Sequence, residues 1–241
     1  MALLPLDVQN AYRDRYRALR PGWRPSGDEL ESIVRSYVTH DSRVLDLGCG
    51  RGGVAEVIWP DVRLAAGIDP DLASLRQHRA AGMPVVRGVA ERLPFEADAF
   101  DLVVSVWVLE HLVDPLGAFI EIRRVLAPGG HFVFLTPNLR NPVMLMNRIG
   151  RAVPALQRRL VTRVYGRDEA DTFRVRYRAN TERDIRAHAL GSGLRVHDLR
   201  VVADPTYLAL NRMMFNASVM SERLMPKAWG VHLLGDLMRP S

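Results

Sequence analysis

The stretch RVLDLGCGRGG, residues 43–53, combines an apolar run, an aspartate and four glycines. An apolar strand followed directly by a glycine-rich turn is typical of the first crossover in a parallel α/β sheet. Gly48, Gly50 and Gly53 fit the G-x-G-x-x-G spacing of dinucleotide-binding loops. Gly48, Gly50 and Gly52 fit G-x-G-x-G equally well, so the spacing leaves open a nucleotide, another cofactor or a purely structural turn.

Two acidic residues narrow this choice. Asp69 closes the next strand in GIDPD, residues 67–71, where a carboxylate can accept hydrogen bonds from a ribose diol. Asp46 lies two residues before Gly48, and its negative charge would repel an incoming diphosphate in a poorly screened cleft. A ligand with an ammonium group suits this position better. S-adenosylmethionine combines an adenosine, a ribose diol and an amino acid, and it is therefore the ligand we expect.

The composition excludes several classes of protein. The chain has 241 residues, 48% of them hydrophobic, which is enough for a full core and argues against disorder. Its single cysteine, Cys49, excludes an internal disulfide and a zinc site built from cysteines, and no metal site is expected. There is no run of 18 apolar residues, and the opening MALLPLD lacks the basic lead of a signal peptide. These features predict a soluble, cytoplasmic protein.

Apolar strands and helices alternate after residue 40. The predicted strands cover 43–47, 63–68, 84–88, 101–107 and 131–136, and the helices between them cover 53–59, 71–81 and 114–127. The strands are nearly continuous apolar runs, as in a parallel sheet that is buried on both faces. Asp114 followed by Pro115 is a strong helix start. Strict alternation predicts an α/β fold with a Rossmann-like, doubly wound sheet.

The rest of the chain is arranged around this core, and we expect a single domain in four parts. Residues 1–40 would form a helical cover, 41–137 the cofactor-binding core, 138–180 an inserted basic cap, and 181–241 the remainder of the sheet. In that remainder, a helix over 181–190 and a strand over 194–202 precede an irregular insertion, 204–228. A last strand over 231–238 would complete a seven-stranded, mostly parallel sheet and run antiparallel.

Several ordered motifs resemble the class I S-adenosylmethionine-dependent methyltransferases of the small-molecule type. VLDLGCGRGG (44–53) resembles the family's first motif and GIDPD its second. RGVAERLPFEADAFDLVVSVWVLEHLVDP (87–115) is similar to the third and fourth motifs. EIRRVLAPGGHFVFLTPN (121–138) resembles the helix, turn and fifth strand that follow. The resemblance implies a Rossmann-like fold and S-adenosylmethionine as the cofactor.

Carried over position by position, the resemblance implies a set of cofactor-binding residues. They are Asp46, Gly48, Cys49 and Gly50 at the methionine end, Asp69 at the ribose, Pro70, Ala90 and Glu91 at the adenine, and Val106 and Trp107 beside the sulfonium. One position departs from the family, which often has an aspartate before the Ala-Glu pair where this chain has Val89. We expect backbone groups or Glu91 to supply the missing hydrogen bond.

The implied reaction is methyl transfer to an oxygen or carbon atom of a small-molecule or lipid- or glycan-linked acceptor, which leaves S-adenosylhomocysteine. VWVLEH stands where methyltransferases of base amines or glutamine amides often carry an Asn-Pro-Pro-aromatic type sequence, and this disfavours those acceptors. His111 is the candidate catalytic base, although Glu110 and His111 could instead only shape the loop. Residues that could line the acceptor site by position are Tyr12, Tyr16, Trp23, Arg174, Arg176, Tyr177 and Arg178.

Basic residues are concentrated in one segment. Residues 140–178 contain ten arginines and three acidic residues, in a chain with a net charge of +6. Within it, 147–167 has apolar residues at helical spacing and arginines opposite them. A solvated cap helix, peripheral contact with the inner membrane surface and a site for an anionic substrate stay open. Nucleic acid is disfavoured, because aromatic residues that stack on bases are sparse nearby.

Three other functions remain as alternatives. The chain could bind S-adenosylmethionine without catalysis, or use the arginine-rich segment to methylate RNA. The least favoured alternative is an NAD-dependent oxidoreductase, which only the degenerate glycine spacing supports. The sequence does not indicate an oligomeric state.

Overall fold

The computed structural model describes residues 6–142, 144–145, 174–208, 211–224 and 226–241. The chain forms two compact units. The sheet unit consists of Gly27–Pro137, Val175–Arg200 and Leu233–Ser241. The helical unit consists of Met1–Ser26, Asn138–Arg174 and Val201–His232. Most of the arginine-rich segment, including 147–167, lies outside the described residues.

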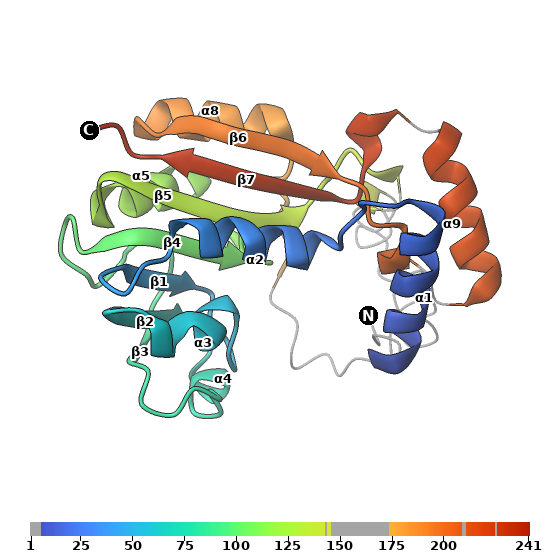
Figure 1. The fold of residues 1–241 in the computed structure, drawn as a ribbon. Helices are drawn as coiled ribbons and strands as arrows, with labels where there is room; N and C mark the ends of the chain where they lie inside the picture. The colour runs from blue at the N-terminus through green and yellow to red at the C-terminus, as the bar shows by residue number, and fades with distance from the viewer. Residues whose placement is uncertain (1–5, 143, 146–173, 209–210, 225) are drawn as a thin grey trace. The chain divides into compact units, whose positions relative to one another are not determined.

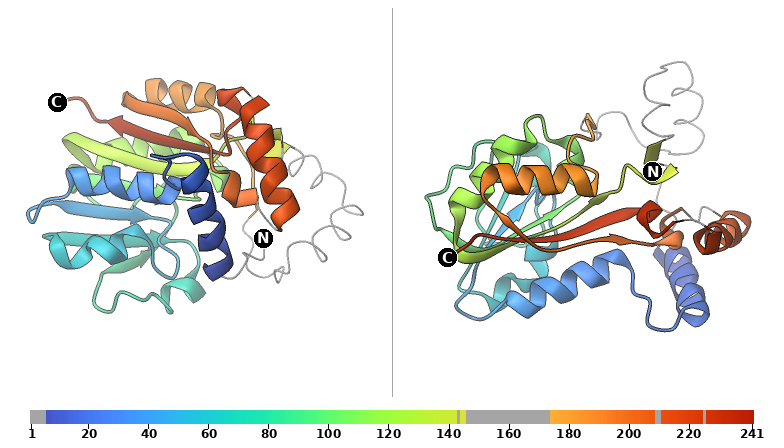
Figure 2. Two further views of the ribbon diagram at one scale, coloured as in Figure 1. Left: turned by 45° about the vertical axis from the view of Figure 1, so that its right-hand side comes forward. Right: turned by 90° about the horizontal axis from the view of Figure 1, so that it is seen from above.

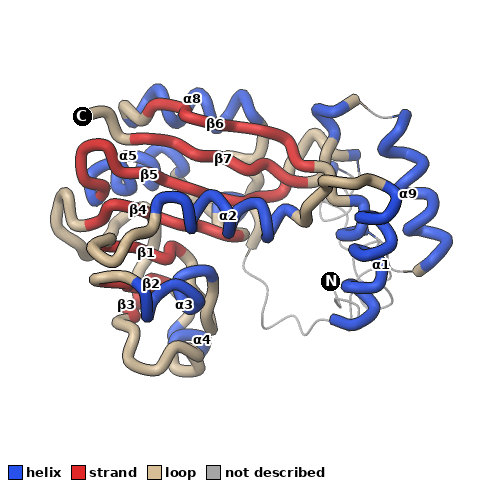
Figure 3. The backbone as a smooth tube through the Cα atoms, viewed as in Figure 1, coloured by secondary structure: helices blue, strands red, loops and turns tan. Residues whose placement is uncertain are grey.

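A seven-stranded sheet in the order β3-β2-β1-β4-β5-β7-β6 carries the fold (Figures 1 and 3). The strands are β1 Arg43–Leu47, β2 Leu64–Asp69, β3 Val85–Arg87, β4 Phe100–Val106, β5 Leu126–Pro137, β6 Arg195–Val202 and β7 His232–Met238. The first five strands pair in parallel. The predicted Rossmann-like sheet is confirmed, and every strand expected from the apolar runs is present.

The last strand, β7, lies beside β5 and runs antiparallel to it. The amide of Gly129 donates to the carbonyl of Arg239, and the amide of Asn138 donates to the carbonyl of Val231, each at 2.9 Å. As the residue number rises along β5 from Gly129 to Asn138, the number of the bonded residue falls from Arg239 to Val231. This confirms the predicted antiparallel strand at the end of the chain.

Helices cover both faces of the sheet. Figures 1 and 2 show α2 (Ser26–Tyr37) along one face and α5 (Pro115–Val125) with α8 (Glu182–Ser192) along the other. Helix α5 begins where Asp114 and Pro115 predict, since the Asp114 carboxylate accepts the amide of Gly117 at 3.1 Å. Apolar cover on two faces explains why the central strands are apolar at nearly every position.

Two predicted segments differ from the structure. The expected helix over 71–81 is one short turn, α4 Leu72–Leu75, which Asp71 caps by accepting the amides of Ala73 and Ser74. The stretch 204–228, expected to be irregular, contains the short helix η4 (Pro205–Leu208), the longer α9 (Arg212–Leu224) and η5 (Lys227–Trp229). Helix α9 was missed because its apolar side chains are mostly exposed. Met213 and Met220, for example, are 77% and 68% exposed.

An aromatic cluster forms the core of the helical unit. Tyr16 on α1 (Leu6–Leu19) and Phe215 on α9 are both fully buried. Tyr12 stacks on Phe215 with ring centroids 4.9 Å apart, and Trp23 meets Tyr16 edge-on at 4.7 Å. These contacts bring the N-terminal helix and α9 together, although nearly 200 residues separate them in sequence.

Gly235 offers a test of how tightly β5 and β7 pack. A Cβ atom at this position would lie 2.1 Å from the ring of Phe134, which belongs to the facing strand. We predict that Gly235→Ala lowers the free energy of unfolding by about 1–3 kcal/mol, because the ring has no room to move within a packed core. Urea unfolding followed by circular dichroism measures this difference.

Gly27→Ala provides the matched control. An added Cβ at Gly27 meets no atom within 4 Å, and the residue lies in the first turn of α2. This variant should be as stable as the parent protein or slightly more stable. Equal stability of the Gly235→Ala variant and the parent would contradict the packing described here.

Candidate active site

The strand order reverses between β1 and β4, and doubly wound folds bind their ligands at the carboxyl ends of the two strands at such a switch point. Asp46 is the next-to-last residue of β1, between Gly67 of β2 and Val104 of β4. Its side chain is only 3% exposed. The carboxylate thus lies at the edge of the sheet where doubly wound folds bind their ligands.

The backbone conformation of the loop after β1 favours glycine at positions 48 and 50. Gly48 and Gly50 have φ angles of +82° and +50°, in the left-handed region that side chains disfavour. A Cβ at Gly48 would also lie 2.1 Å from Cγ2 of Val108, which follows β4. At Gly50 the nearest atom to such a Cβ is an oxygen of Asp69, at 3.9 Å. Gly48 is therefore closed off by protein, whereas Gly50 faces open space.

Asp69 joins this loop to the end of β2. Its Oδ2 accepts the amide of Gly50 at 3.0 Å, and its Oδ1 accepts the amide of Asp71 at 2.8 Å. The side chain is 7% exposed. Each carboxylate oxygen has two acceptor sites, so one on each remains for a further donor. Two oxygens side by side with spare acceptor sites suit a pair of vicinal hydroxyls.

Cys49 packs inward. A Cβ at Gly67 would lie 2.6 Å from Sγ of Cys49, which shows how closely the thiol approaches the backbone of β2. Burial, followed by the negative charges of Asp46 and Asp69, raises the pKa of the Cys49 thiol to about 12. The thiol is therefore protonated near neutral pH and is no nucleophile. Only its backbone could contribute to a cofactor site.

The residues predicted at the adenine lie in the loops after β2 and β3. Pro70 is exposed and its carbonyl accepts Nε of Arg87 at 3.2 Å, whereas Ala90 is buried. Glu91 accepts the amides of Val113 and Asp114 at 2.9 and 3.3 Å. Its carboxylate thus ties the loop after β3 to the loop after β4, a role that the sequence did not reveal. The proposed adenine contacts of these residues stay predictions.

The chain turns sharply at the end of β4. Val106 is the last residue of the strand, and Trp107 follows with φ at +61°, an uncommon conformation for a bulky residue. The amide of Trp107 still donates to the carbonyl of Leu135 on β5 at 3.0 Å. This strained turn directs the next residue, Val108, against Gly48. Strain of this kind is often found where a site requires a particular backbone path.

Glu110 is a buried carboxyl group in the loop that follows. It is 6% exposed, and Oγ1 of Thr136 donates to its Oε2 at 3.0 Å. Nδ2 of Asn180 donates to the same threonine hydroxyl at 2.8 Å and to the carbonyl of Pro137 at 3.0 Å. Burial raises the pKa of Glu110 to about 7. Thr136 and Asn180 were not predicted; Thr136 is only a polar residue at the end of an apolar run, and the polar residues around Asn180 do not single it out.

His111 is adjacent to this buried group and partly exposed. Its Nε2 lies 4.0 Å from Oε1 of Glu110, and its side chain is 30% exposed. The carbonyl of Glu110 accepts the amides of Arg176 and Tyr177 at 2.7 and 3.1 Å. The loop that carries His111 is thus held from two sides, while the imidazole itself reaches solvent.

A methyltransferase domain family matches residues 45–134, which include the glycine loop, Asp69, β4 and His111. Residues 45–134 therefore belong to a methyltransferase domain, and the chain has the fold of class I S-adenosylmethionine-dependent methyltransferases. The fold agrees with this assignment. A solved S-adenosylmethionine-dependent methyltransferase from Mesorhizobium loti has a TM-score of 0.59 with this chain at 19% identity, and the match covers 86% of this chain and 96% of that one.

Two relatives of the methyltransferase domain are mycobacterial enzymes. Phthiotriol/phenolphthiotriol dimycocerosates methyltransferase 1 of Mycobacterium ulcerans is 37% identical over 121 residues, 46% of this chain and 44% of the relative. Fatty-acid O-methyltransferase of Mycolicibacterium smegmatis is 39% identical over 99 residues, 38% of this chain and 36% of the relative. The chain thus spans less than half the length of the relatives it matches.

The geometry of the domain fits S-adenosylmethionine. Gly50 leaves open space beside Asp69, and the two oxygens of Asp69 have acceptor sites to spare. The side chains of Asp46 and Asp69 place two carboxyl groups at this edge of the sheet, close enough to Cys49 to act on its thiol. A cofactor with an ammonium group and a sulfonium meets favourable charge there, whereas a diphosphate would not.

The residues predicted to line an acceptor site fall into two groups. Tyr12, Tyr16 and Trp23 belong to the helical unit, where Tyr12 packs on Phe215. Arg176, Tyr177 and Arg178 belong to the sheet unit, where Nη1 of Arg178 donates to the carbonyl of Val113 at 2.6 Å. Arg174 is exposed. Their contact with an acceptor stays a prediction.

Among the described residues, no three His, Cys, Asp or Glu side chains are grouped so that they could hold a metal ion. Within the same part of the chain, no helix is long and apolar enough to cross a membrane.

The raised pKa of Glu110 makes stability depend on pH. Because the folded protein holds this proton up to a pH of about 7, whereas an unfolded chain releases it near the ordinary glutamate pKa of 4.5, stability falls as the pH rises between these values. Glu110→Gln mimics the protonated acid and removes this loss. We predict that the variant gains stability over the parent as pH rises, by up to about 3 kcal/mol above pH 7.

Urea unfolding at several pH values between 4.5 and 8 measures this gain. Glu96→Gln, at an exposed glutamate, is the matched control and should follow the parent at every pH. A constant difference between the Glu110→Gln variant and the parent across this range would contradict the raised pKa.

Proposed function

We propose that the chain is an enzyme that transfers a methyl group from S-adenosylmethionine to an oxygen atom of a lipid-type acceptor. The observation that carries the proposal is the arrangement of Asp46, the open Gly50 and Asp69 at the switch point of a matching domain. The two mycobacterial relatives, named for a phthiotriol lipid and for fatty acids, support the acceptor class.

The residues of the sheet unit would divide the work of cofactor binding. Asp69 would accept hydrogen bonds from the two ribose hydroxyls while it keeps the loop in place through the amide of Gly50. Asp46 would attract the ammonium group of the methionine end, and Val106 and Trp107 would border the sulfonium. Glu91 would hold the loops after β3 and β4 together around the adenine.

When bound, S-adenosylmethionine supplies a methyl group whose bond to sulfur breaks as the new bond to oxygen forms, and the bonding electron pair returns to sulfur. The protein then has two tasks, namely to align the acceptor oxygen with that bond and to remove a proton where the acceptor carries one. His111 would take the proton of a hydroxyl acceptor, because its imidazole is partly exposed on a loop that Glu110 anchors. A carboxylate acceptor is already ionised near neutral pH and needs no base.

Replacing Asp69 tests the cofactor site. We predict that Asp69→Ala weakens the binding of S-adenosylhomocysteine at least tenfold, since hydrogen bonds to a charged group contribute about 1.5–3 kcal/mol each. Isothermal titration calorimetry measures the affinity. Asp61→Ala removes an exposed carboxylate elsewhere in the sheet unit and should leave the affinity unchanged. Unchanged binding in the Asp69→Ala variant, or tight binding of NAD by the parent, would refute the proposed cofactor site.

Replacing His111 tests the base. We predict that His111→Ala slows methyl transfer to hexadecanol by about 10²–10⁴-fold, because general base catalysis contributes on that order. Transfer to hexadecanoate should change only a few-fold, and the affinity for S-adenosylhomocysteine should not change. His40→Ala, at an exposed histidine, is the control. Full activity of the His111→Ala variant on the alcohol, measured with radiolabelled methyl donor, would exclude the base role.

A further inference from the structure

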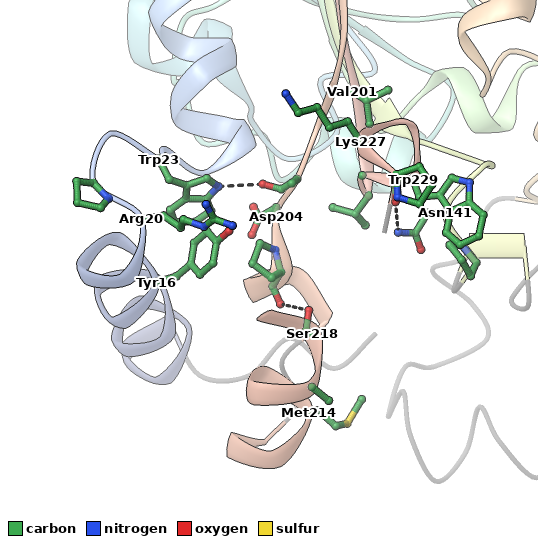
Figure 4. A pocket seen from close by; sticks show the side chains of 18 residues that line it. Tyr16, Arg20, Trp23, Asn141, Val201, Asp204, Met214, Ser218, Lys227 and Trp229 are labelled. Atoms are coloured by element: carbon green, nitrogen blue, oxygen red, sulfur yellow. Dashed lines mark hydrogen bonds between the residues drawn. The ribbon is translucent and has the colours of Figure 1, made fainter. Parts of the chain in front are cut away.

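The helical unit contains a pocket of about 690 Å³, which lies outside the residues that the family match covers. Figure 4 shows it with Tyr16, Arg20 and Trp23 on one side, Asn141 and Trp229 on the other, and Asp204 and Ser218 between them. Its volume is typical of pockets that bind small molecules, which span about 300–1,000 Å³. Every residue that lines it belongs to the helical unit.

Apolar side chains dominate the lining. They belong to Tyr16, Pro21, Trp23, Pro142, Val201, Ala203, Pro205, Met214, Ala217, Pro226, Trp229 and Val231. Four of these residues are prolines, and two are tryptophans, which have large apolar surfaces. Covering a surface of this kind with hydrocarbon is favourable, because water is excluded from it.

Most polar groups of the lining are bonded within the protein. Nε1 of Trp23 donates to the carbonyl of Ala203 at 2.9 Å, and Nδ2 of Asn141 donates to the carbonyl of Trp229 at 2.8 Å. Oγ of Ser218 donates to the carbonyl of Pro205 at 3.0 Å. These hydrogen bonds hold the pocket walls together, so the polar groups that form them have little capacity left to bind a polar ligand.

Asp204 is also engaged on its buried side. It accepts the hydroxyl of Thr206 at 2.5 Å and the hydroxyl of Ser26 at 3.3 Å. His232 contacts the same serine hydroxyl through Nδ1 at 2.7 Å, and burial lowers its pKa to about 3, so the imidazole is neutral near pH 7. The carboxylate of Asp204 therefore has hydroxyl donors but no cation behind it.

Two cations remain for a ligand. Arg20 and Lys227 line the pocket, and both are exposed. Neither makes an ion pair or a side-chain hydrogen bond to another residue in the part of the chain that the structure describes. Two cations and one carboxylate leave the charged lining positive by one unit. An apolar interior with a positive, solvated rim is complementary to a monoanion with a hydrocarbon tail.

We propose that this pocket binds a long-chain carboxylate, with the alkyl chain against the apolar walls and the carboxylate near Arg20 and Lys227. The inference deepens the proposed function by naming a substrate class, and only the role of the bound acid as methyl acceptor rests on that function. Binding itself requires neither the cofactor nor the methyltransferase reaction.

Tryptophan fluorescence provides the test, because Trp23 and Trp229 are two of the four tryptophans in the chain and both line the pocket. The full-length protein is titrated with hexadecanoate below its micelle concentration. We expect saturable quenching, with hexadecylamine at least tenfold weaker because its charge has the opposite sign. Equal affinity for the acid and the amine, or no saturable binding of either, would overturn the proposal.

Two variants separate the tail from the head group. Ala217→Phe places a ring in the pocket from α9 and should weaken hexadecanoate binding at least tenfold. Met213→Phe, on the same helix but outside the lining, is its matched control and should bind as the parent does. The double variant Arg20→Gln, Lys227→Gln should lose about tenfold for hexadecanoate and none for hexadecanol. Urea unfolding of each variant verifies that it folds. Unchanged hexadecanoate binding in Ala217→Phe would place the ligand elsewhere.

The outcomes distinguish this proposal from the proposed function. Asp69→Ala, which should lose the cofactor, should still bind hexadecanoate with the affinity of the parent. If the acid binds in the pocket and is never methylated, the pocket assignment holds and the acceptor assignment fails. If the acid is methylated while Ala217→Phe binds it with unchanged affinity and methylates it with an unchanged KM, the pocket assignment fails and the reaction stands.

Discussion

The side chain of Val108 occupies the space where residue 48 would carry a Cβ, and the rest of the proposed cofactor site depends on this close approach. The contact joins the loops that leave β1 and β4, which are the two strands at the switch point. It requires glycine at position 48 and a sharp turn at Trp107, whose positive φ directs Val108 inward. With these loops fixed against each other, Gly50 is left facing open space beside Asp69.

Three buried carboxyl groups lie at this edge of the sheet in different surroundings. Asp69 accepts two backbone amides, and Asp46 and Asp69 both act as negative charges on Cys49. Glu110 accepts the hydroxyl of Thr136, and burial raises its pKa to about 7, so it holds its proton up to about neutral pH. The first two can attract a cationic cofactor, whereas Glu110 serves the loop that carries His111. The same chemical group, a carboxyl, thus has two proposed roles, and its surroundings separate them.

The sequence predicts well whatever depends on neighbouring residues. Apolar runs gave the strands, and Asp114 with Pro115 gave the start of α5, because strand burial and helix capping are local effects. Contacts between distant residues could not be read in this way. Asn180 meets Thr136 across 44 residues, and Glu91 meets Val113 only because both loops leave the same edge of the sheet. Helix α9 was missed because it buries few of its apolar side chains.

The difference between local patterns and contacts of distant residues also separates the proposed cofactor site from the pocket proposed for the acceptor. The family match covers residues 45–134, and no residue that lines the pocket of the helical unit falls within that range. The proposed cofactor residues follow one another along consecutive loops and therefore form readable motifs. The pocket is assembled from separate stretches near residues 16–23, 141–142 and 201–231, so no motif can describe it. Its ligand has to be inferred from what the assembled surface offers, which is hydrocarbon contact and a positive rim.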